Sequence, residues 1–473
     1  MNITGKGRCN VTNDCDRETL LASIPGNGRF LYGALTRFTP RDTMAFFEAL
    51  GVPANWKEAI AKDSIGICVF ARGAGEGNTY KPGSALNYAG EATGEDPLKL
   101  SADELAVVEA AKETCSKVIV LLNTGNNMMI ADIAEGGSHE VDGICYIGCP
   151  NDYQTIGIAN VLTGKVNATG ALASAFVRDH QSIPAVQNVG GDYFADYEIV
   201  CRNDDPRYPG KEIGNIGTGS FGGADTYNGG MYIVEAEGIY VGYKYYETRY
   251  EDAVMEQGNA SGNAGIFASK GDSWVYGEEV AYPFGYGMSY TTFEQALESV
   301  TYDAATDSFT VLVKVTNTGN VAGKEVVQVY GQQPYTEFDR ANAIEKASVQ
   351  LVGFGKTNVL QPGESETVSV TVDRKELTVY DEHVNKTYIL EAGDYYLSVG
   401  LDAHDAVNNI LAAKGYAPIA QETPAAEGAE EAETATLTAN GAAAMDAPGD
   451  AAKVYKFTVD SDDNATYLSL IHI

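Results

Sequence analysis

The sequence of 473 residues predicts an α/β domain with a mostly parallel sheet, followed by an all-β sandwich. From about residue 64 to 163, continuous apolar runs alternate with helical segments, which is typical of a parallel sheet covered on both faces. From about 295 to 400 the hydrophobic period becomes two, and turn residues separate short strands, as in a β-sandwich. Residues 418–452 are acidic and rich in Ala, Glu, Thr and Pro, which indicates a solvated linker.

The α/β part contains alternating strands and helices. Apolar runs predict buried parallel strands at 64–71, 118–123 and 143–148. Ser101 and Glu104 form a capping box that opens a helix to about residue 114. Further helices are expected near 127–135 and 154–163. Between 185 and 290, Gly, Tyr and Asn predominate, and we expect long loops that wrap back over the domain.

The sandwich is expected to consist of short strands. Period-two patterns place strands at 309–315, 325–330, 368–372 and 395–400. Turn signals separate them at 317–320, 362–363 and 392–394. A short strand-like piece follows at 453–459, and the apolar end LSLIHI is typical of a chain that was cut.

The charge balance narrows the classes of partner. The chain has 32 Lys+Arg against 65 Asp+Glu and a formal net charge of -33, which argues against nucleic acid and anionic membranes as partners. It lacks both an apolar run of membrane-spanning length and an N-terminal signal sequence, so a cytoplasmic location is expected. Seven Cys and five His show no metal-binding spacing, and we expect no metal site.

Several stretches within residues 55–415 resemble glycoside hydrolase family 3, the β-glucosidase and β-xylosidase family. These stretches are RGAGEG (72–77), VIVLLNTGN (118–126), VLTGKVNATG (161–170), EGIYVGYKYYETRYEDAV (237–254) and YPFGYGMSYTTFE (282–294). The resemblance implies a six-stranded α/β sandwich at 55–294 and a fibronectin type III-like domain at 295–400. Residues 401–473 are then an acidic linker and a truncated end. The family's catalytic TIM-like barrel is absent here, and the resemblance implies that it follows residue 467.

Residues 1–53 differ from the rest of the chain. They carry six Lys/Arg and five Asp/Glu, so the acidity lies entirely after residue 53. ITGKGRCNVTND (3–14) and FTPRDTMAFFEALGVP (38–53) resemble flavin-dependent oxidoreductases of the aminoacetone-oxidase-like group. In that group the GKGRCN loop lies against FAD, but the dinucleotide fingerprint that precedes it is missing here. We therefore expect no cofactor, and a chain composed of two unrelated pieces.

The candidate catalytic residue is Glu76. Hydrolysis with retention needs two carboxyl groups about 5–5.5 Å apart. The family resemblance implies that the general acid/base comes from the α/β sandwich and that the nucleophile is an Asp of the missing barrel, so no nucleophile is assigned in this chain. Glu76 follows the first parallel strand, where ligands of open α/β sheets bind. Gly75 and Gly77 allow a tight loop that presents its carboxyl group.

The Glu76 loop departs from the family pattern. The family usually continues GEG-x-Asp-Arg, whereas this chain has Asn78, Thr79 and Tyr80, so two residues that would fix the loop are missing. The alternative carboxylates further along the chain are Glu91, Glu95 and Asp96.

The predicted function is that of a fragment of a retaining β-glucosidase-type hydrolase, whose substrate is a β-linked glucoside or oligosaccharide. Alone, this chain is expected to be inactive. One alternative is a non-catalytic carbohydrate-binding or structural module, and another is a fragment of a flavin-dependent oxidoreductase. The tyrosines within 240–250 could form a sugar-stacking face, but interdomain packing is the favoured interpretation.

Overall fold

A computed structural model gives the fold of the chain. It describes residues 61, 63–73, 83–86, 91–151, 153–185, 237–257, 274–418 and 445–467. The chain divides into two compact units, residues 1–158 and 159–473, and each is considered by itself. The predicted boundary between the α/β domain and the sandwich, at 294–295, therefore lies within the second unit.

The first unit contains the predicted parallel sheet, with the strand order β1-β2-β3. Its elements are β1 (Ile65–Ala71), α5 (Ala102–Thr114), β2 (Lys117–Asn123) and β3 (Gly143–Tyr146), and α6 (Gln154–Leu162) runs on into the second unit. The capping box of α5 is present as predicted, since the Ser101 hydroxyl accepts from the Glu104 N–H and the Glu104 carboxylate accepts from the Ser101 N–H.

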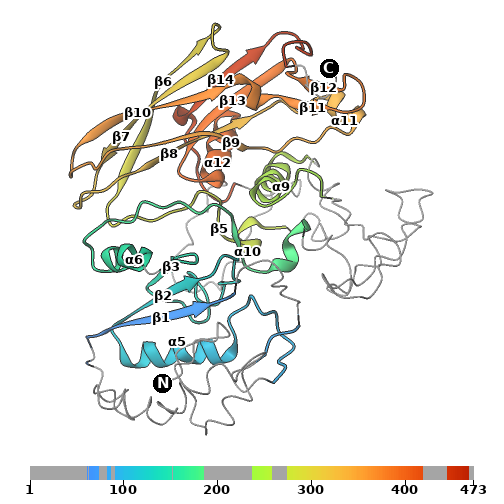
Figure 1. Cartoon of the computed structure of the whole chain (residues 1–473). Coiled ribbons are helices and arrows are strands. Elements are labelled where there is room, and N and C mark those ends of the chain that lie inside the picture. Colours follow the sequence, from blue (N-terminus) through green and yellow to red (C-terminus); the bar gives the residue numbers. More distant parts are fainter. Residues whose placement is uncertain are drawn as a thin grey trace, which may run out of the picture. The chain divides into compact units, whose positions relative to one another are not determined.

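Helix α5 covers one face of β1 (Figure 1). Gly66 faces this helix so closely that a Cβ atom there would lie 3.3 Å from Ala111 Cβ and 3.2 Å from Cys115 Sγ. Among the residues that the structure describes, helix α5 covers one face of this sheet. The predicted cover on the other face is not seen there, since Ile65, Ile67 and Val69 are about half exposed.

The predicted helix near 127–135 is wrong. The segment forms a single turn, in which the N–H groups of Ile133 and Ala134 donate to the Ile130 carbonyl. Its apolar side chains Met128, Ile130 and Ile133 are nevertheless buried. A short apolar run looks alike in a buried turn and in a helix, so its periodicity did not separate the two.

The second unit contains a β-sandwich made of two antiparallel sheets (Figure 1). One sheet has the order β10-β7-β6 and the other β14-β13-β8-β9. Their strands are β6 (Phe293–Asp303), β7 (Ser308–Asn317), β8 (Val326–Gln332), β9 (Gln350–Lys356), β10 (Ser365–Asp373), β13 (Gly393–Gly400) and β14 (Val454–Val459). Valines on alternate positions, such as Val311, Val313, Val329 and Val370, fill the core between the sheets.

Smaller elements complete the second unit. They are β4 (Phe176–Val177), η2 (His180–Ser182), α9 (Tyr243–Met255), α10 (Tyr276–Glu279), β5 (Val280–Tyr282), α11 (Glu337–Asn342), η5 (Arg374–Leu377), β11 (Val379–Asp381), β12 (Thr387–Ile389), α12 (Ala403–Ala413) and η6 (Ala451–Lys453). Strands β4 and β5 pair with each other, as do β11 and β12. Within the described ranges, no helix combines the length and apolarity needed to cross a membrane.

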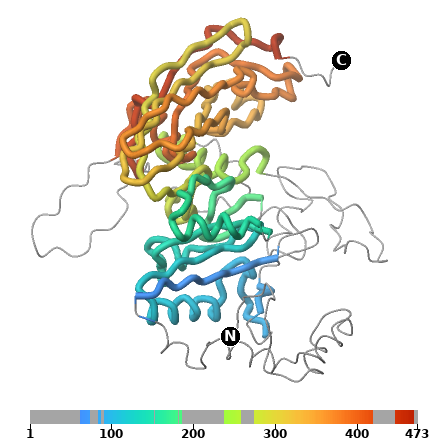
Figure 2. The backbone as a smooth tube through the Cα atoms, turned by 60° about the vertical axis from the view of Figure 1, so that its left-hand side comes forward, coloured from blue at the N-terminus to red at the C-terminus, as the bar shows by residue number. Residues whose placement is uncertain are grey.

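The sandwich continues beyond residue 400, its predicted end. Strand β14 pairs along β13 from Gly393↔Val459 to Ser398↔Val454, and Figure 2 shows this red segment beside the orange strands. Helix α12 begins at the Asp402 cap and buries Val407 and Ile410. These two elements lie within 401–473, where a linker and truncated end were predicted, and each buries an apolar face against the sandwich. Residues 419–444 and 468–473 lie outside the described residues, so the predicted acidic linker stays a prediction.

The tyrosine-rich stretch forms helix α9 and not the loop that was predicted. Tyr245, Tyr246 and Tyr250 are buried in a core that also contains residues of α12. This burial agrees with packing as the favoured interpretation and leaves these rings no face for a sugar. The helix was missed because charged residues, among them Glu247 and Asp252, occupy buried positions in it and interrupt the apolar period.

Strand β14 provides a test of where the sandwich ends. Phe457 stacks on Tyr395 with ring centroids 5.2 Å apart and lies 4.7 Å from the Phe309 ring. We expect Phe457→Ala to lower the free energy of unfolding by about 2 kcal/mol, because a half-buried aromatic contact with both sheets is lost. The matched control is Phe354→Ala in β9, whose ring is 72% exposed and which we expect to change stability by less than about 0.5 kcal/mol. Equal effects in urea unfolding would show that β14 is not part of the core.

Candidate active site

The loop that carries Glu76 begins where β1 ends. Glu76, Gly75 and Gly77 lie outside the described residues, so the geometry available is that of the point from which the loop departs. Arg72 and Gly73 follow β1 directly, and β2 ends beside them at Asn123. Strands β1 and β2 are parallel, so their carboxyl ends meet at the edge of the sheet where ligands of such folds bind.

Arg72 fastens this end of β1 to the start of α5. Its guanidinium donates two hydrogen bonds of 2.8 Å to the two oxygens of Glu104, and both side chains are buried. The remaining N–H groups donate to the carbonyls of Ala71 at 3.0 Å, Pro97 at 2.5 Å and Lys99 at 2.8 Å. The charge of Arg72 is therefore compensated by Glu104, and all five of its N–H donors are bonded. This fixes the orientation of the guanidinium group.

The first residue of the loop is held by the segment that follows the neighbouring strand β2. The Asn126 side-chain N–H donates to the Gly73 carbonyl at 3.1 Å, and the Asn126 backbone N–H donates to Thr124 Oγ1 at 2.9 Å. The Arg72 backbone N–H donates to the Asn123 carbonyl at 3.3 Å. The loop therefore departs from a base that is fixed by residues of β2, α5 and the segment before α5.

The alternative carboxylates are not arranged as a catalytic pair. Asp96 accepts from the Leu98 N–H at 2.7 Å and so closes a turn, while Glu91 is exposed. Glu95 and Asp96 line a recess of about 10 Å³ beside Arg72. This recess holds no more than about one water molecule, so no sugar ring fits there. Glu76 lies outside the described residues, so its assignment as the acid/base stays a prediction.

The roles of Arg72 and Asn126 were not expected from the sequence. Glu104 was identified as a helix cap, and its second role as the partner of Arg72 was missed. The available signal was an arginine directly after a continuous apolar strand, since a buried guanidinium requires a carboxylate partner. The sequence lacks the Asp and Arg expected after GEG, whereas Arg72, on the strand side of the loop, is fixed at the end of β1.

A second group of titratable residues surrounds His404 in the second unit. The imidazole Nδ1 lies 2.8 Å from Glu247 Oε2, and Nε2 lies 2.9 Å from Asp446 Oδ2. Its ring stacks on Tyr276 with centroids 3.7 Å apart. Burial opposes a charge on His404, but the two carboxylates outweigh it and raise its pKa to about 10. This arrangement links α9, α12 and residue 446 as a structural ion cluster.

The structure also bears on possible metal sites. Within the described ranges, no group of three or more His, Cys, Asp or Glu side chains could hold a metal ion. Cys149 is exposed, and Cys145 is partly buried.

Comparison with known families agrees with this architecture. Residues 55–290 match the glycosyl hydrolase family 3 C-terminal domain, and residues 325–403 match a fibronectin type III-like domain. The chain carries the C-terminal domain of glycosyl hydrolase family 3. Its α/β sandwich and the following fibronectin type III-like domain are those that the sequence resemblance implied.

The curated relatives of this family 3 chain include three named glycosidases. A β-glucosidase of Ruminococcus albus is 28% identical over 74% of this chain and 28% of its own length. β-Glucosidase B of Emericella nidulans is 30% identical over 55% of this chain and 24% of its own. An exo-α-(1→6)-L-arabinopyranosidase of Bifidobacterium longum is 28% identical over 67% of this chain and 32% of its own. This chain therefore spans about a third or less of the length of these relatives.

Two solved structures share the fold of this family 3 chain. β-Glucosidase 3B of Thermotoga neapolitana, solved in complex with α-D-glucose, is 28% identical with a TM-score of 0.50, over 73% of this chain and 37% of that one. A β-glucosidase of Paenibacillus barengoltzii is 24% identical with a TM-score of 0.51, over 74% of this chain and 30% of that one, and it supports the fold alone. Both family matches begin after residue 53, so the flavoprotein resemblance of residues 1–53, which lie outside the described residues, stays a prediction.

The Arg72–Glu104 pair allows a direct test of the loop base. We expect Arg72→Met to destabilise the first unit by about 3 kcal/mol or more, because it leaves the Glu104 carboxylate buried without its partner. The double variant Arg72→Met/Glu104→Leu should lose less stability than the sum of the losses in the two single variants. Urea unfolding of the wild type, both single variants and the double variant measures this difference. The control is Lys112→Met, which breaks an exposed pair with Glu109 and should cost less than about 0.5 kcal/mol. Strict additivity in the double variant would show that the pair is not coupled.

The His404 cluster predicts a pH dependence of stability. Folding raises the pKa of His404 from 6.5 to about 10. The charged His404 therefore contributes fully to the free energy of unfolding below pH 6.5, and this contribution is lost as the pH rises to about 10. The facing tyrosines, Tyr250 and Tyr276, have pKa values raised by burial and stay neutral in this range. Asp446 has a lowered pKa, because its bonds to His404 and Tyr250 outweigh burial, and it stays charged there.

The measurement is urea unfolding between pH 6 and 10 for the wild type and His404→Gln. We expect the stability difference between them to shrink as the pH rises. His383→Gln is the control, because His383 is exposed and pairs with Glu382 at the surface. A difference that does not depend on pH would contradict a charged His404.

Proposed function

We propose that this chain supplies the general acid/base of a retaining β-glycosidase, with Glu76 in that role. The observation that carries the proposal is the fixed base of the Glu76 loop, formed by Arg72, Glu104 and Asn126 at the carboxyl end of the parallel sheet. Four peptide units between Arg72 and Glu76 limit the separation of their Cα atoms to about 14 Å. The family 3 domain and the named β-glucosidases among the relatives support the same reaction class.

In the proposed reaction, Glu76 first protonates the oxygen of the departing group. The nucleophilic carboxylate attacks the anomeric carbon from the other side and forms a glycosyl–enzyme intermediate. Glu76 then removes a proton from the water that hydrolyses this intermediate. The nucleophile is expected on the family's barrel domain, which the sequence resemblance places after residue 467.

The proposed substrate is a β-linked glucoside or oligosaccharide. Two of the curated relatives are named β-glucosidases, and the Thermotoga neapolitana enzyme was solved with α-D-glucose. The named arabinopyranosidase shows that relatives at similar identity act on another sugar, so an aryl α-L-arabinopyranoside belongs in the substrate panel. Nucleic acid and membranes are not proposed as partners, and the expected cytoplasmic location stays a prediction.

The test compares this chain alone with the same chain joined at residue 467 to a family 3 barrel domain. We expect 4-nitrophenyl β-D-glucoside to be hydrolysed by the joined protein and not by the chain alone. In the joined protein, Glu76→Gln should lower kcat by roughly 10²- to 10⁴-fold for a poor leaving group, because protonation is lost. Azide should restore turnover of a substrate with a good leaving group, since that group leaves without protonation.

The matched control is Glu91→Gln, a carboxylate further along the same segment, which should leave kcat unchanged. Turnover by the chain alone would contradict the proposal, because it would require a second carboxylate here. An undiminished rate in Glu76→Gln would reject Glu76 and return the choice to the other carboxylates.

A further inference from the structure

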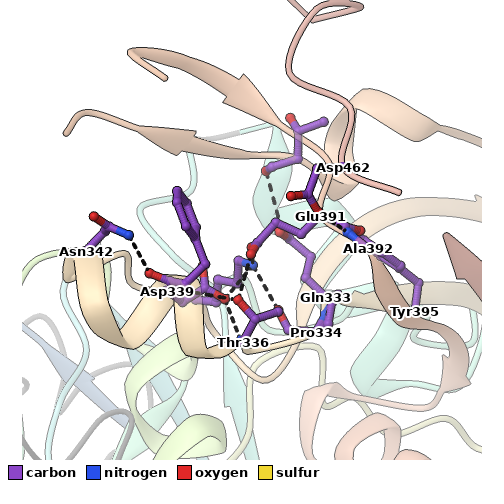
Figure 3. A network of polar contacts seen from close by, with 12 residues as sticks. Gln333, Pro334, Thr336, Asp339, Asn342, Glu391, Ala392, Tyr395 and Asp462 are labelled. Atoms are coloured by element: carbon purple, nitrogen blue, oxygen red, sulfur yellow. Dashed lines mark hydrogen bonds and ion pairs between the residues drawn. The ribbon is translucent and has the colours of Figure 1, made fainter. Parts of the chain in front are cut away.

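A buried cluster in the second unit brings one lysine into contact with two acidic side chains. Lys346, Asp339 and Glu391 are each at most 5% exposed. The Lys346 ammonium donates to Asp339 Oδ2 at 2.9 Å, to the Pro334 carbonyl at 2.9 Å and to Glu391 Oε2. Figure 3 shows the hydrogen bonds and ion pairs that join Asp339, on α11, to Glu391, in the chain before β13.

The cluster carries an excess of negative charge if all three groups are ionised. Among the described residues, Lys346 is the only cation that binds either carboxylate. An uncompensated charge away from water is strongly destabilising, so the cluster is expected to hold one additional proton. Burial raises the pKa of Glu391 and outweighs the opposing effect of Lys346, which makes Glu391 the group that holds this proton.

The two oxygens of Asp339 have different surroundings. Oδ2 accepts the Thr336 backbone N–H at 2.7 Å in addition to Lys346, whereas Oδ1 is buried and makes no hydrogen bond. Both oxygens of Glu391 are bonded, Oε1 by the Thr336 hydroxyl at 2.7 Å and Oε2 by Lys346. A buried oxygen without a partner is costly, and a reaction that removes Oδ1 would relieve this cost.

The Lys346 nitrogen lies close to the carboxyl carbon of Asp339. Nζ is 2.9 Å from Oδ2, and a carbon–oxygen bond is about 1.2 Å long, so Nζ and Cγ are separated by no more than about 4 Å. Atoms about 3–3.5 Å apart are in position to react. Asp339 is held in the capping box of α11, and the Lys346 carbonyl accepts the Tyr240 hydroxyl at 3.2 Å. Only the Lys346 side chain therefore has to move for the two atoms to meet.

We propose that Lys346 and Asp339 form an intramolecular amide bond, with Glu391 as the group that carries the protons. The Lys346 ammonium first transfers a proton to the Asp339 carboxylate, because a buried site favours the uncharged amine and carboxylic acid. Nζ then attacks Cγ, and the Thr336 N–H stabilises the negative charge that develops on Oδ2. Glu391 gives its proton to Oδ1, which leaves as water, and takes a proton from Nζ.

The reaction is balanced by groups within the cluster. One ammonium and one carboxylate become one amide and one water molecule, Glu391 is regenerated, and no oxidant or other reactant is consumed. Oδ2 remains as the amide oxygen with its hydrogen bond from Thr336. The bond ties α11 to the chain before β9, and its formation does not depend on Glu76 or on the proposed glycosidase activity.

Mass spectrometry of the whole chain in denaturant tests this proposal. We expect the mass to be lower than that of the sequence by one water molecule, because a covalent bond persists in the unfolded chain. Trypsin would normally cut after Arg340 and Lys346, but an amide at Lys346 blocks the second cut. The digest should therefore contain a branched peptide in which residues 325–340 are joined to residues 341–356.

Variants of the three residues separate their roles. Lys346→Met removes the amine and Glu391→Gln removes the proton carrier, so both should have the full mass of their sequences. Asp339→Asn should reach the same final mass as the wild type, since ammonia then leaves in place of water. The matched control is Lys414→Met, because Lys414 is a partly buried lysine bound to one carboxylate, that of Glu251, and this variant should still lose one water.

Melting temperatures show which variants fold, and the mass of the wild type decides the matter even where a variant does not. A wild type with the full mass of its sequence would show that the three side chains remain an ion cluster, and would overturn the proposal. A branched peptide that contains residues 387–414, and with them Glu391, would overturn the choice of Asp339. Loss of water in a folded Glu391→Gln variant to the same extent as in the wild type would reject Glu391 as the proton carrier.

Discussion

The buried ion pair between Arg72 and Glu104 is the interaction on which the candidate active site depends. A guanidinium and a carboxylate withdrawn from water lose several kcal/mol of hydration each, and good geometry with further hydrogen bonds is needed to recover this loss. Here Arg72 also donates to three carbonyl groups, and Glu104 also caps α5. Loss of this pair would therefore release three segments at once: the end of β1, the start of α5 and the segment before α5.

The second unit obeys the same constraint through helix α9. Glu247 and Glu251 are buried on this helix, and each has partners that lie far away in the sequence. Glu247 is bound by Tyr276 and His404, and Glu251 by Gln332 and Lys414. Removing one partner would leave a buried carboxylate uncompensated, so α9, α12 and β8 have a single well-satisfied arrangement.

Local signals were sufficient for much of the fold. The Ser101–Glu104 capping box and the apolar runs at 118–123 and 143–148 describe interactions between near neighbours, and the structure contains the helix and strands that they predict. Helix α9 could not be predicted in this way, because its buried charges are satisfied by residues up to about 160 positions away. Strand β14 was recognised as strand-like, but only its pairing with β13 shows that it belongs to the sandwich.

In the proposed site, the acid/base Glu76 and the nucleophile would lie on different domains. A glycine-rich loop after a parallel strand identifies Glu76, and family resemblance gives it a role. The sequence does not predict which residues fix the base of this loop, because the partners are far apart in the chain. Arg72 binds Glu104, 32 positions away, and Asn126 binds Gly73, 53 positions away. Retention requires the carboxyl groups to stay about 5–5.5 Å apart through both steps. A loop can hold one of them to that distance only if its base is rigid, and the anchored end of β1 meets this requirement from within the chain.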